Sequence, residues 1–341
     1  MDWKKYIKDG LYVGLGLFLI AVLVLRADAT DTMDLLSKVD LSLIGLVIGL
    51  YFLNTFCKVI RWYGLLKGMG AKKTGPVVLP IFLASLALNN STPGKVGGEP
   101  VRALMLKEHT GTRGSLGIAT IFAEKSLDIL MILSFAVLGL IYMVMILGFE
   151  DVKAMVLMVG AGGILIITVI AVFLNRRMIQ WARSLLQKGA LKLSGGNRGS
   201  RSYKMLSSLS SFLDRFYRSL WAIRKDPSRG AGVVLMTVAI WFNEAVRLFL
   251  VLQAIPGDHS ISFPGAIAAI AVANILGFIL PIGSGNVIGS ASVLELLAGD
   301  ELLATAASLL QVATSLWISI PLGIISLLFL RIRGKKREDG A

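Results

Sequence analysis

Two short irregular stretches between apolar segments hold most of the residues that could bind a ligand. The first, residues 89–102, offers Asn89, Lys95, Gly97, Gly98, Glu99 and Arg102, and the second, residues 281–290, offers Asn286 and Ser290. A helix is expected to begin near Pro100 in the first and at Ser290 or Ser292 in the second. The start of a helix attracts anions, so the pattern predicts a phosphate or phosphodiester site, with Lys95 and Arg102 adding full charges. The alternative is that the two glycines only permit tight packing and that Arg102 anchors the chain at the membrane surface.

Two pairs of charged residues lie inside apolar segments. Glu124 and Asp128 are four residues apart and share one face of a predicted helix. There they could pair with Arg102 or with a neighbouring lysine, or repel each other and carry protons. Glu244 and Arg247 are three residues apart and are expected to form an ion pair within one helix. An unpaired charge is costly in hydrocarbon, so all four residues predict charge pairing or proton coupling.

The sequence shows no set of residues for catalysis or metal binding. Cys57 is the only cysteine, and the two histidines, His109 and His259, are far apart in sequence. No metal-ligand cluster is therefore visible, and residues 93–95 lack the spacing of a Walker loop. We expect a protein that is not an enzyme and that uses no metal or cofactor.

The composition is that of a membrane protein. Of the 341 residues, 55% are hydrophobic and only 16% are charged, and the mean hydropathy is +0.74. A soluble protein carries roughly 25% charged residues, so a disordered chain, a coiled coil and an ordinary soluble enzyme are excluded. The net charge of +14 reflects topology, because cytoplasmic loops collect Lys and Arg. We therefore expect no nucleic-acid partner.

Six apolar segments are predicted to cross the membrane: residues 11–25, 41–60, 117–147, 154–174, 231–253 and 302–330. Basic residues concentrate in the loops on one side of these spans, and acidic residues concentrate in those on the other. This asymmetry predicts a multi-pass protein of the cell (inner or plasma) membrane with both termini in the cytoplasm. Cleavage after the first span, at Ala27-Asp28-Ala29, is an alternative to its retention.

Two further apolar segments, residues 76–113 and 262–299, are broken in the middle by proline and glycine. The first arm of the earlier segment, residues 76–88, would be about 20 Å long as a helix, whereas the hydrocarbon core is about 30 Å thick. We predict two re-entrant helical hairpins, the first entering from the cytoplasm and the second from outside. The alternative is eight full spans. Either version is an all-α polytopic membrane protein.

The predicted segments fall into two matching sets of opposite orientation within a single membrane domain, residues 1–341. Repeat one is residues 1–150 and repeat two is residues 151–341, the inverted-topology pattern of many secondary transporters. Between the fourth and fifth spans lies a basic amphipathic segment, residues 175–230, which is expected in the cytoplasm. It could lie on an anionic membrane surface or pack against the cytoplasmic ends of the spans. Residues 195–202 within it are predicted to form a flexible link.

Three features together resemble a known family: Arg61-Trp62 closing the second span, the run from Asn89 to Arg102, and Glu124 with Asp128. They resemble the transmembrane region of lysylphosphatidylglycerol synthases, a flippase-like integral membrane family, over nearly the whole chain. Multiple peptide resistance factors of that family join a lipid-flipping membrane domain to a cytosolic aminoacyl transferase domain. The resemblance implies the lipid-flipping half alone. The second hairpin departs from the family's usual Pro-Gly-Gly-x-Gly-x-x-Glu pattern, because no glutamate occurs there before Glu295.

We therefore expect a membrane lipid translocator whose partner is an anionic membrane lipid. The head group, of a phospholipid or a polyprenyl-phosphate-linked lipid, would pass through a polar cavity between the two hairpins. The alternatives are a secondary carrier of a small anionic solute and a membrane scaffold or regulator of a lipid-linked glycosyltransferase. A homo-oligomer or a lipid-modifying enzyme partner is compatible with each of them.

Overall fold

The computed structural model describes residues 20–71, 74–90, 92, 97–193, 200–222, 226–257, 261–280 and 283–338. All regular structure in these residues is helical, which confirms the predicted all-α class. Four described segments are long and apolar enough to cross a membrane: α3, α6, α10 and the continuous stretch Glu301–Ile332. The first predicted span lies largely outside the described residues, of which 20–26 are helical. The number of spans and the internal repeat stay predictions.

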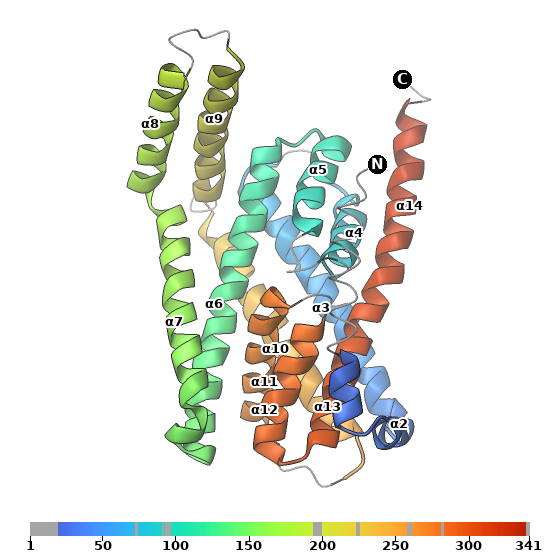
Figure 1. The fold of residues 1–341 in the computed structure, drawn as a ribbon. Helices are drawn as coiled ribbons and strands as arrows, with labels where there is room; N and C mark the ends of the chain where they lie inside the picture. The colour runs from blue at the N-terminus through green and yellow to red at the C-terminus, as the bar shows by residue number, and fades with distance from the viewer. Residues whose placement is uncertain are drawn as a thin grey trace.

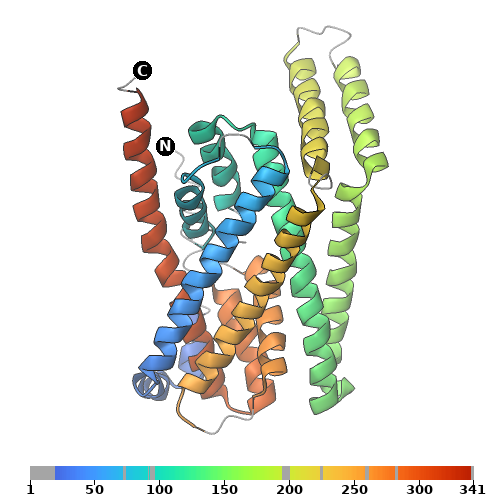
Figure 2. The same cartoon turned by 180° about the vertical axis from the view of Figure 1, so that it is seen from behind.

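The helices follow one another in the order α2 (Ala29–Ser37), α3 (Leu41–Gly68), α4 (Val78–Asn90), α5 (Gly98–Thr110), α6 (Gly114–Leu147), α7 (Phe149–Leu174), α8 (Arg176–Leu193), α9 (Arg201–Ala222), α10 (Pro227–Ala254), α11 (Phe263–Ile279), α12 (Ser284–Ala298), α13 (Glu301–Val312), the π-helical turn η3 (Ala313–Trp317) and α14 (Ile318–Glu338). Figures 1 and 2 show them as one elongated bundle. The predicted fourth span coincides with α7.

Helices α3 and α10 pack along each other through the body of the bundle (Figure 2). Each begins at an aspartate whose side chain accepts backbone N–H groups, Asp40 in α3 and Asp226 in α10. Hydrogen bonds from Ser42 hold the pKa of Asp40 below its ordinary value. Deeper in the pair, the Asn54 amide donates to the Ile240 carbonyl across 2.8 Å. These two helices carry several of the charged residues described below.

Two helical hairpins enter the bundle from opposite ends (Figure 1). The pair α4–α5 enters from the end that carries α8 and α9, and the pair α11–α12 enters from the end that carries α2. Their helices have 13, 13, 17 and 15 residues, which makes each about 20–26 Å long. All four are shorter than the roughly 30 Å thickness of a hydrocarbon core. The first arms are held by long helices: α4 packs on α14, and α11 packs on α6.

The second arm of each hairpin begins earlier than the sequence predicts. Helix α5 begins at Gly98, so Pro100 still lies in its first turn. Helix α12 begins at Ser284, and the predicted start at Ser290 or Ser292 is wrong. The reason is Gly283, which adopts a left-handed conformation (φ 75°) that ends the turn there. Ser290 and Ser292 are interior residues of the helix, and their hydroxyls donate to carbonyls of the preceding turn.

The last predicted span is one continuous helical stretch that contains a π-helical turn. Helix α13 ends at Val312, and the π-helical turn η3 follows before α14 continues the same direction (Figure 1). A π-helical turn inserts one extra residue and turns side chains onto a new face, and such turns are frequent at functional sites. The uninterrupted apolar pattern of residues 302–330 gives no sign of it.

The basic segment forms an antiparallel pair, α8 and α9, that projects beyond one end of the bundle (Figure 1). Helix α9 packs against α6, where the rings of Phe216 and Phe122 lie 5.5 Å apart in an edge-to-face contact. Of the two placements expected for this segment, packing against the ends of the spans is therefore the one that the structure has for α9. Residues 194–199 of the predicted link lie outside the described residues.

Candidate functional site

A cavity of about 210 Å³ lies where the two hairpins approach each other. The first hairpin contributes Asn89, Glu99 and Arg102 to its wall, and the second contributes Asn286 and Ser290. The long helices contribute Glu124, Asp128 and Glu244 from the predicted set, together with Lys58, Arg61 and Gln311. Residues that are far apart in sequence thus share one polar cavity. Lys95 lies outside the described residues.

Six charged residues on one side of the cavity form a group that we call the balanced cluster: Arg61, Glu99, Arg102, Glu124, Lys125 and Asp128. Arg61 bridges two carboxylates of α6, with Nη1 2.6 Å from Asp128 Oδ1 and Nη2 3.1 Å from Glu124 Oε1. Arg102 bridges the same Glu124 and Glu99, with Nη1 3.1 Å from Glu124 Oε2 and Nη2 2.7 Å from Glu99 Oε2. Lys125 Nζ lies 3.0 Å from Glu99 Oε1. Three cations therefore neutralise three carboxylates.

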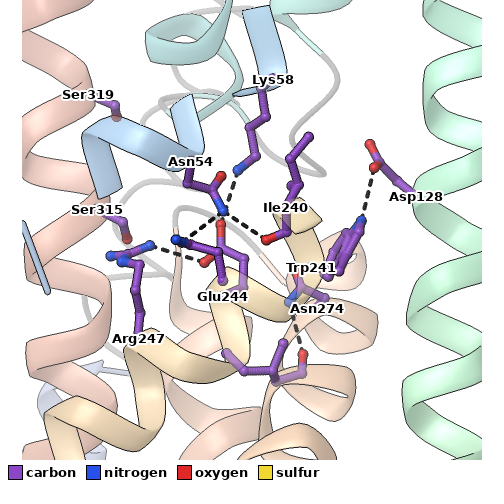
Figure 3. Close-up of polar contacts among 12 residues, drawn as sticks. Asn54, Lys58, Asp128, Ile240, Trp241, Glu244, Arg247, Asn274, Ser315 and Ser319 are labelled. Carbon is purple, nitrogen blue, oxygen red and sulfur yellow. Dashed lines mark hydrogen bonds and ion pairs between the residues drawn. The ribbon is translucent and has the colours of Figure 1, made fainter. Parts of the chain in front are cut away.

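The two arginines of the balanced cluster are buried and fixed by further contacts. Each is 2% exposed. The Arg102 guanidinium lies over the rings of Trp62 and Phe82, at 5.0 and 5.2 Å from their centroids. On the other side of the cluster, the Trp241 indole N–H donates to Asp128 across 3.0 Å (Figure 3). Because its charges are already paired, this side of the cavity offers a ligand little net charge.

Three residues on the other side form a group that we call the cationic triad: Lys58, Glu244 and Arg247 (Figure 3). Lys58 Nζ lies 3.0 Å from Glu244 Oε1, and Arg247 Nη1 lies 3.1 Å from Glu244 Oε2. Two cations share one carboxylate, so the triad carries an excess positive charge. Arg247 is fully buried and lies over the Tyr51 ring at 5.1 Å, whereas the Lys58 side chain is 24% exposed. Lys58 is therefore the accessible cation of the triad.

The predicted contacts of the charged residues are largely present, although their partners were incompletely foreseen. Glu244 and Arg247 form the expected ion pair within α10. Glu124 pairs with Arg102, as one alternative had it, but it also pairs with Arg61. The sequence pattern puts Lys58 and Arg61 at the cytoplasmic end of the second predicted span, residues 41–60. Helix α3 continues to Gly68 and carries both side chains into the bundle.

The start of α5 is occupied by contacts within its own hairpin. The Gly98 N–H donates to Asn89 Oδ1 across 2.8 Å, and the Asn89 amide donates to Glu99 Oε1 across 2.8 Å. The Gly97 N–H donates to the Thr92 hydroxyl across 3.1 Å. A Cβ atom on Gly98 would lie 1.9 Å from the Ser85 carbonyl oxygen, so the α4–α5 contact needs glycine there. These contacts give Asn89, Gly97 and Gly98 a packing role.

The second hairpin and the neighbouring α13 contain both paired and unpaired polar groups. Ser290 is tied to α13 by a 2.8 Å hydrogen bond to the Ser308 hydroxyl. By contrast, the buried amide oxygens of Asn286 and Gln311 have no hydrogen-bond partner among the residues that the structure describes. Gln311 is 8% exposed and lies at the end of α13, and it is not among the predicted site residues. Its amide, alone in an apolar run at membrane depth, is the signal that could have found it.

The matches to known proteins agree with this architecture. A family model described as the lysylphosphatidylglycerol synthase TM region matches residues 11–323. The chain belongs to this family. It is 25% identical to a UPF0104 membrane protein of Pyrococcus horikoshii over 95% of this chain and 97% of that protein. It is 24% identical to a UPF0104 membrane protein of Methanothermobacter thermautotrophicus over 94% of this chain and 95% of that protein.

A third similar protein is longer than this member of the lysylphosphatidylglycerol synthase TM family. It is named glycosyltransferase AglD, from Haloferax volcanii, and it is 23% identical over 79% of this chain but only 45% of its own length. The chain thus resembles about half of that protein. Among the described residues, no group of three or more His, Cys, Asp and Glu side chains is placed to hold a metal ion.

Proposed function

We propose that the protein is a translocator of anionic membrane lipids. A lipid head group would enter the cavity between the hairpins while its acyl or prenyl tails stay in the bilayer. The protein would supply binding and a path, with no covalent chemistry, and would act in the cell membrane with both termini in the cytoplasm. Its partner is the lipid itself, a phospholipid or a polyprenyl-phosphate-linked lipid.

One observation carries this proposal: a polar, charged cavity lies between two hairpins that are each too short to cross a membrane. Irregular backbone at membrane depth is tolerated only where it is buried in protein or lines a wet cavity. Charged side chains at that depth are costly and usually mark a path for a polar substrate. The two hairpins enter from opposite ends of the bundle (Figure 1), which supports a path open to head groups from either leaflet.

Similar proteins support a lipid substrate without naming it. The family model takes its description from lysylphosphatidylglycerol synthases, whose name refers to a phospholipid. AglD is named a glycosyltransferase, and its similarity to this chain covers less than half of its length. A membrane part shared with a glycosyltransferase favours a lipid-linked sugar as one class of head group. The excess positive charge of the cationic triad supports an anionic head group of either class.

The test is lipid movement in proteoliposomes that contain the purified full-length protein. Head-group-labelled fluorescent phosphatidylglycerol starts in both leaflets, and a membrane-impermeant reductant bleaches the label on the outside. We expect bleaching beyond the outer-leaflet half with the wild-type protein and not with empty vesicles. Bleaching that stops at half in both would contradict the proposal.

A blocking variant links movement to the cavity. Asn274 of α11 lines the cavity, so Asn274→Trp should fill it and slow lipid movement at least tenfold. The matched control is Leu296→Trp in α12, whose side chain is 44% exposed and is not part of the cavity wall. It should leave the rate unchanged. Equal rates for both variants would place the path elsewhere on the molecule.

A further inference from the structure

We infer that the side of the cavity formed by α3, α10 and η3 binds a phosphate ester that carries a neighbouring hydroxyl, with Lys58 holding the phosphate and Gln311 the hydroxyl. This inference rests on the proposed function and names the chemistry of its substrate. The sequence alone favoured Lys95 and Arg102 as the phosphate ligands. The charges and contacts of the described residues point to the cationic triad and to Gln311 instead.

The positive charge of the site is concentrated in the cationic triad. The balanced cluster holds three cations and three carboxylates. Each of these six groups lies within ion-pair distance of at least one group of opposite charge. A phosphate beside Arg102 would have to compete with Glu99 and Glu124 for a guanidinium that already contacts both. In the cationic triad, Glu244 alone faces two cations. An anion there completes the neutralisation of the triad and gains a charge-assisted hydrogen bond.

Access distinguishes the two cations of the triad. Arg247 cannot turn into the cavity, because it is 0% exposed and its Nη2 lies 3.4 Å from the Thr314 carbonyl oxygen of η3. Lys58 reaches Glu244 with the end of a flexible side chain that lines the cavity and is 24% exposed (Figure 3). Lys58 can therefore move from Glu244 to a ligand, while Arg247 keeps Glu244 paired.

A further feature of the cavity wall is the unpartnered amide of Gln311. Its oxygen is buried in the cavity wall without a hydrogen-bond partner in the described part of the chain, and the residue is 8% exposed. Leaving such an atom unpaired is unfavourable. A phosphate oxygen only accepts hydrogen bonds, whereas a hydroxyl both donates and accepts, so a hydroxyl satisfies an amide in either of its two orientations. Asn286 has the same unpartnered oxygen and lines the same cavity.

Lys58 and Gln311 line the same cavity of about 210 Å³, so one small ligand can contact both. The Thr314 hydroxyl donates to the backbone carbonyl of Gln311 across 3.1 Å, and the backbone carbonyl of Thr314 accepts from Arg247. The π-helical turn η3 thus connects the Gln311 backbone to the triad. A ligand that contacts both Lys58 and Gln311 needs its hydroxyl close to its phosphate, as in a glycerol phosphate or a sugar phosphate.

The test is equilibrium binding to the purified full-length protein in detergent, read as the rise of the unfolding temperature with ligand concentration. The probes are short-chain phosphatidylglycerol and short-chain phosphatidylethanol, which carry the same charge but differ in the head-group hydroxyls. Free glycerol 3-phosphate is the soluble probe. We expect phosphatidylglycerol to bind about tenfold more tightly than phosphatidylethanol, and glycerol 3-phosphate to bind far more weakly than either lipid.

Variants separate the contact with the phosphate from the contact with the hydroxyl. Lys58→Gln should weaken both lipids about tenfold, and Gln311→Met, which keeps the length of the side chain, should remove only the preference for phosphatidylglycerol. The matched control is Lys125→Gln, because Lys125 lines the same cavity with a side chain that is 33% exposed but belongs to the balanced cluster. The affinities of Lys125→Gln for both lipids should stay within about twofold of those of the wild type. The unfolding temperature without ligand reports the folding of each variant.

Three results would overturn the inference. The first is equal affinity of the wild-type protein for the two lipids, a comparison that needs no variant. The second is an equal loss of affinity in Lys58→Gln and Lys125→Gln. The third is tight binding of glycerol 3-phosphate, which would make the ligand a soluble phosphate ester. This experiment measures binding, whereas the vesicle experiment measures lipid movement. The inference can therefore be wrong while lipids still cross the vesicle membrane, and lipid movement can be absent while the binding preference is present.

Discussion

The balanced cluster and the cationic triad belong to one site, yet they differ in net charge and in the exposure of their side chains. In the balanced cluster, two buried arginines each bridge two carboxylates, and the formal charges cancel. In the triad, one carboxylate serves two cations, and one of these is a partly exposed lysine. Paired charges at membrane depth hold helices together, and an unpaired excess attracts a ligand. The number of partners per charge thus distinguishes the group that we propose to be structural from the group that we propose to bind a ligand.

Removing Arg61 should have the largest effect, because it leaves Glu124 and Asp128 buried with one cation fewer. Arg61→Leu is expected to lower the free energy of unfolding by about 3–5 kcal/mol. Thermal unfolding in detergent measures this loss. The control is Lys125→Gln at the partly exposed edge of the same cluster, which should cost less than about 1 kcal/mol. A stable Arg61→Leu protein would mean that the balanced cluster is not a structural group.

Removing a charge of each sign should repair part of that damage. In Arg61→Leu/Asp128→Leu, the remaining cluster again has equal numbers of cations and carboxylates. We expect the double variant to be more stable than Arg61→Leu alone by about 1–3 kcal/mol. The two single variants complete the mutant cycle. Strictly additive losses would argue against direct coupling across the 2.6 Å contact between the two side chains.

Neutralising the carboxylate of the triad should change binding in the opposite direction from removing its lysine. Glu244→Gln raises the excess charge of the triad and keeps an amide to accept hydrogen bonds. We expect the affinity for short-chain phosphatidylglycerol to rise several-fold, whereas Lys58→Gln lowers it. The unfolding-temperature titration measures both. A purely structural triad would lose affinity in both variants.

The smallest effect should come from Asp40, which caps the start of α3. Farther along, this helix carries residues of both charge groups. Hydrogen bonds from Ser42 lower the pKa of Asp40 from its ordinary value of 3.8, so this carboxylate stabilises the fold above that value. Its contribution is lost as the pH falls through the lowered pKa. Asp40→Ala should therefore lower the unfolding temperature slightly at neutral pH and make no difference in strong acid. Lipid movement should be unchanged, which separates loss of stability from loss of transport.

The sequence predicts the outline of the fold because its strongest signals are local. Short apolar arms broken by proline and glycine indicate both hairpins, and charged residues inside apolar segments indicate Glu124, Asp128, Glu244 and Arg247. The ion pairs of Lys58 and Arg61 are not predicted, because basic residues at the end of an apolar run are typical of the cytoplasmic end of a span. Their burial depends on carboxylates of other helices, and no local pattern records those partners.

The start of α12 and the turn η3 show a second limit. Ser292 with Glu295 fits a helix cap by composition, but Gly283 ends the turn earlier through its left-handed backbone. The π-helical turn places Thr314 against Arg247 within a run that reads as one continuous apolar helix. In both places, packing between helices that are distant in sequence decides the local structure.

The most direct test is an experimental density map of the purified protein in nanodiscs that contain phosphatidylglycerol. We expect a lipid whose phosphate lies in the cavity within hydrogen-bond distance of Lys58 and whose tails pass out between helices into the bilayer. A cavity closed by side chains, with lipid density only on the outer surface of the bundle, would contradict it.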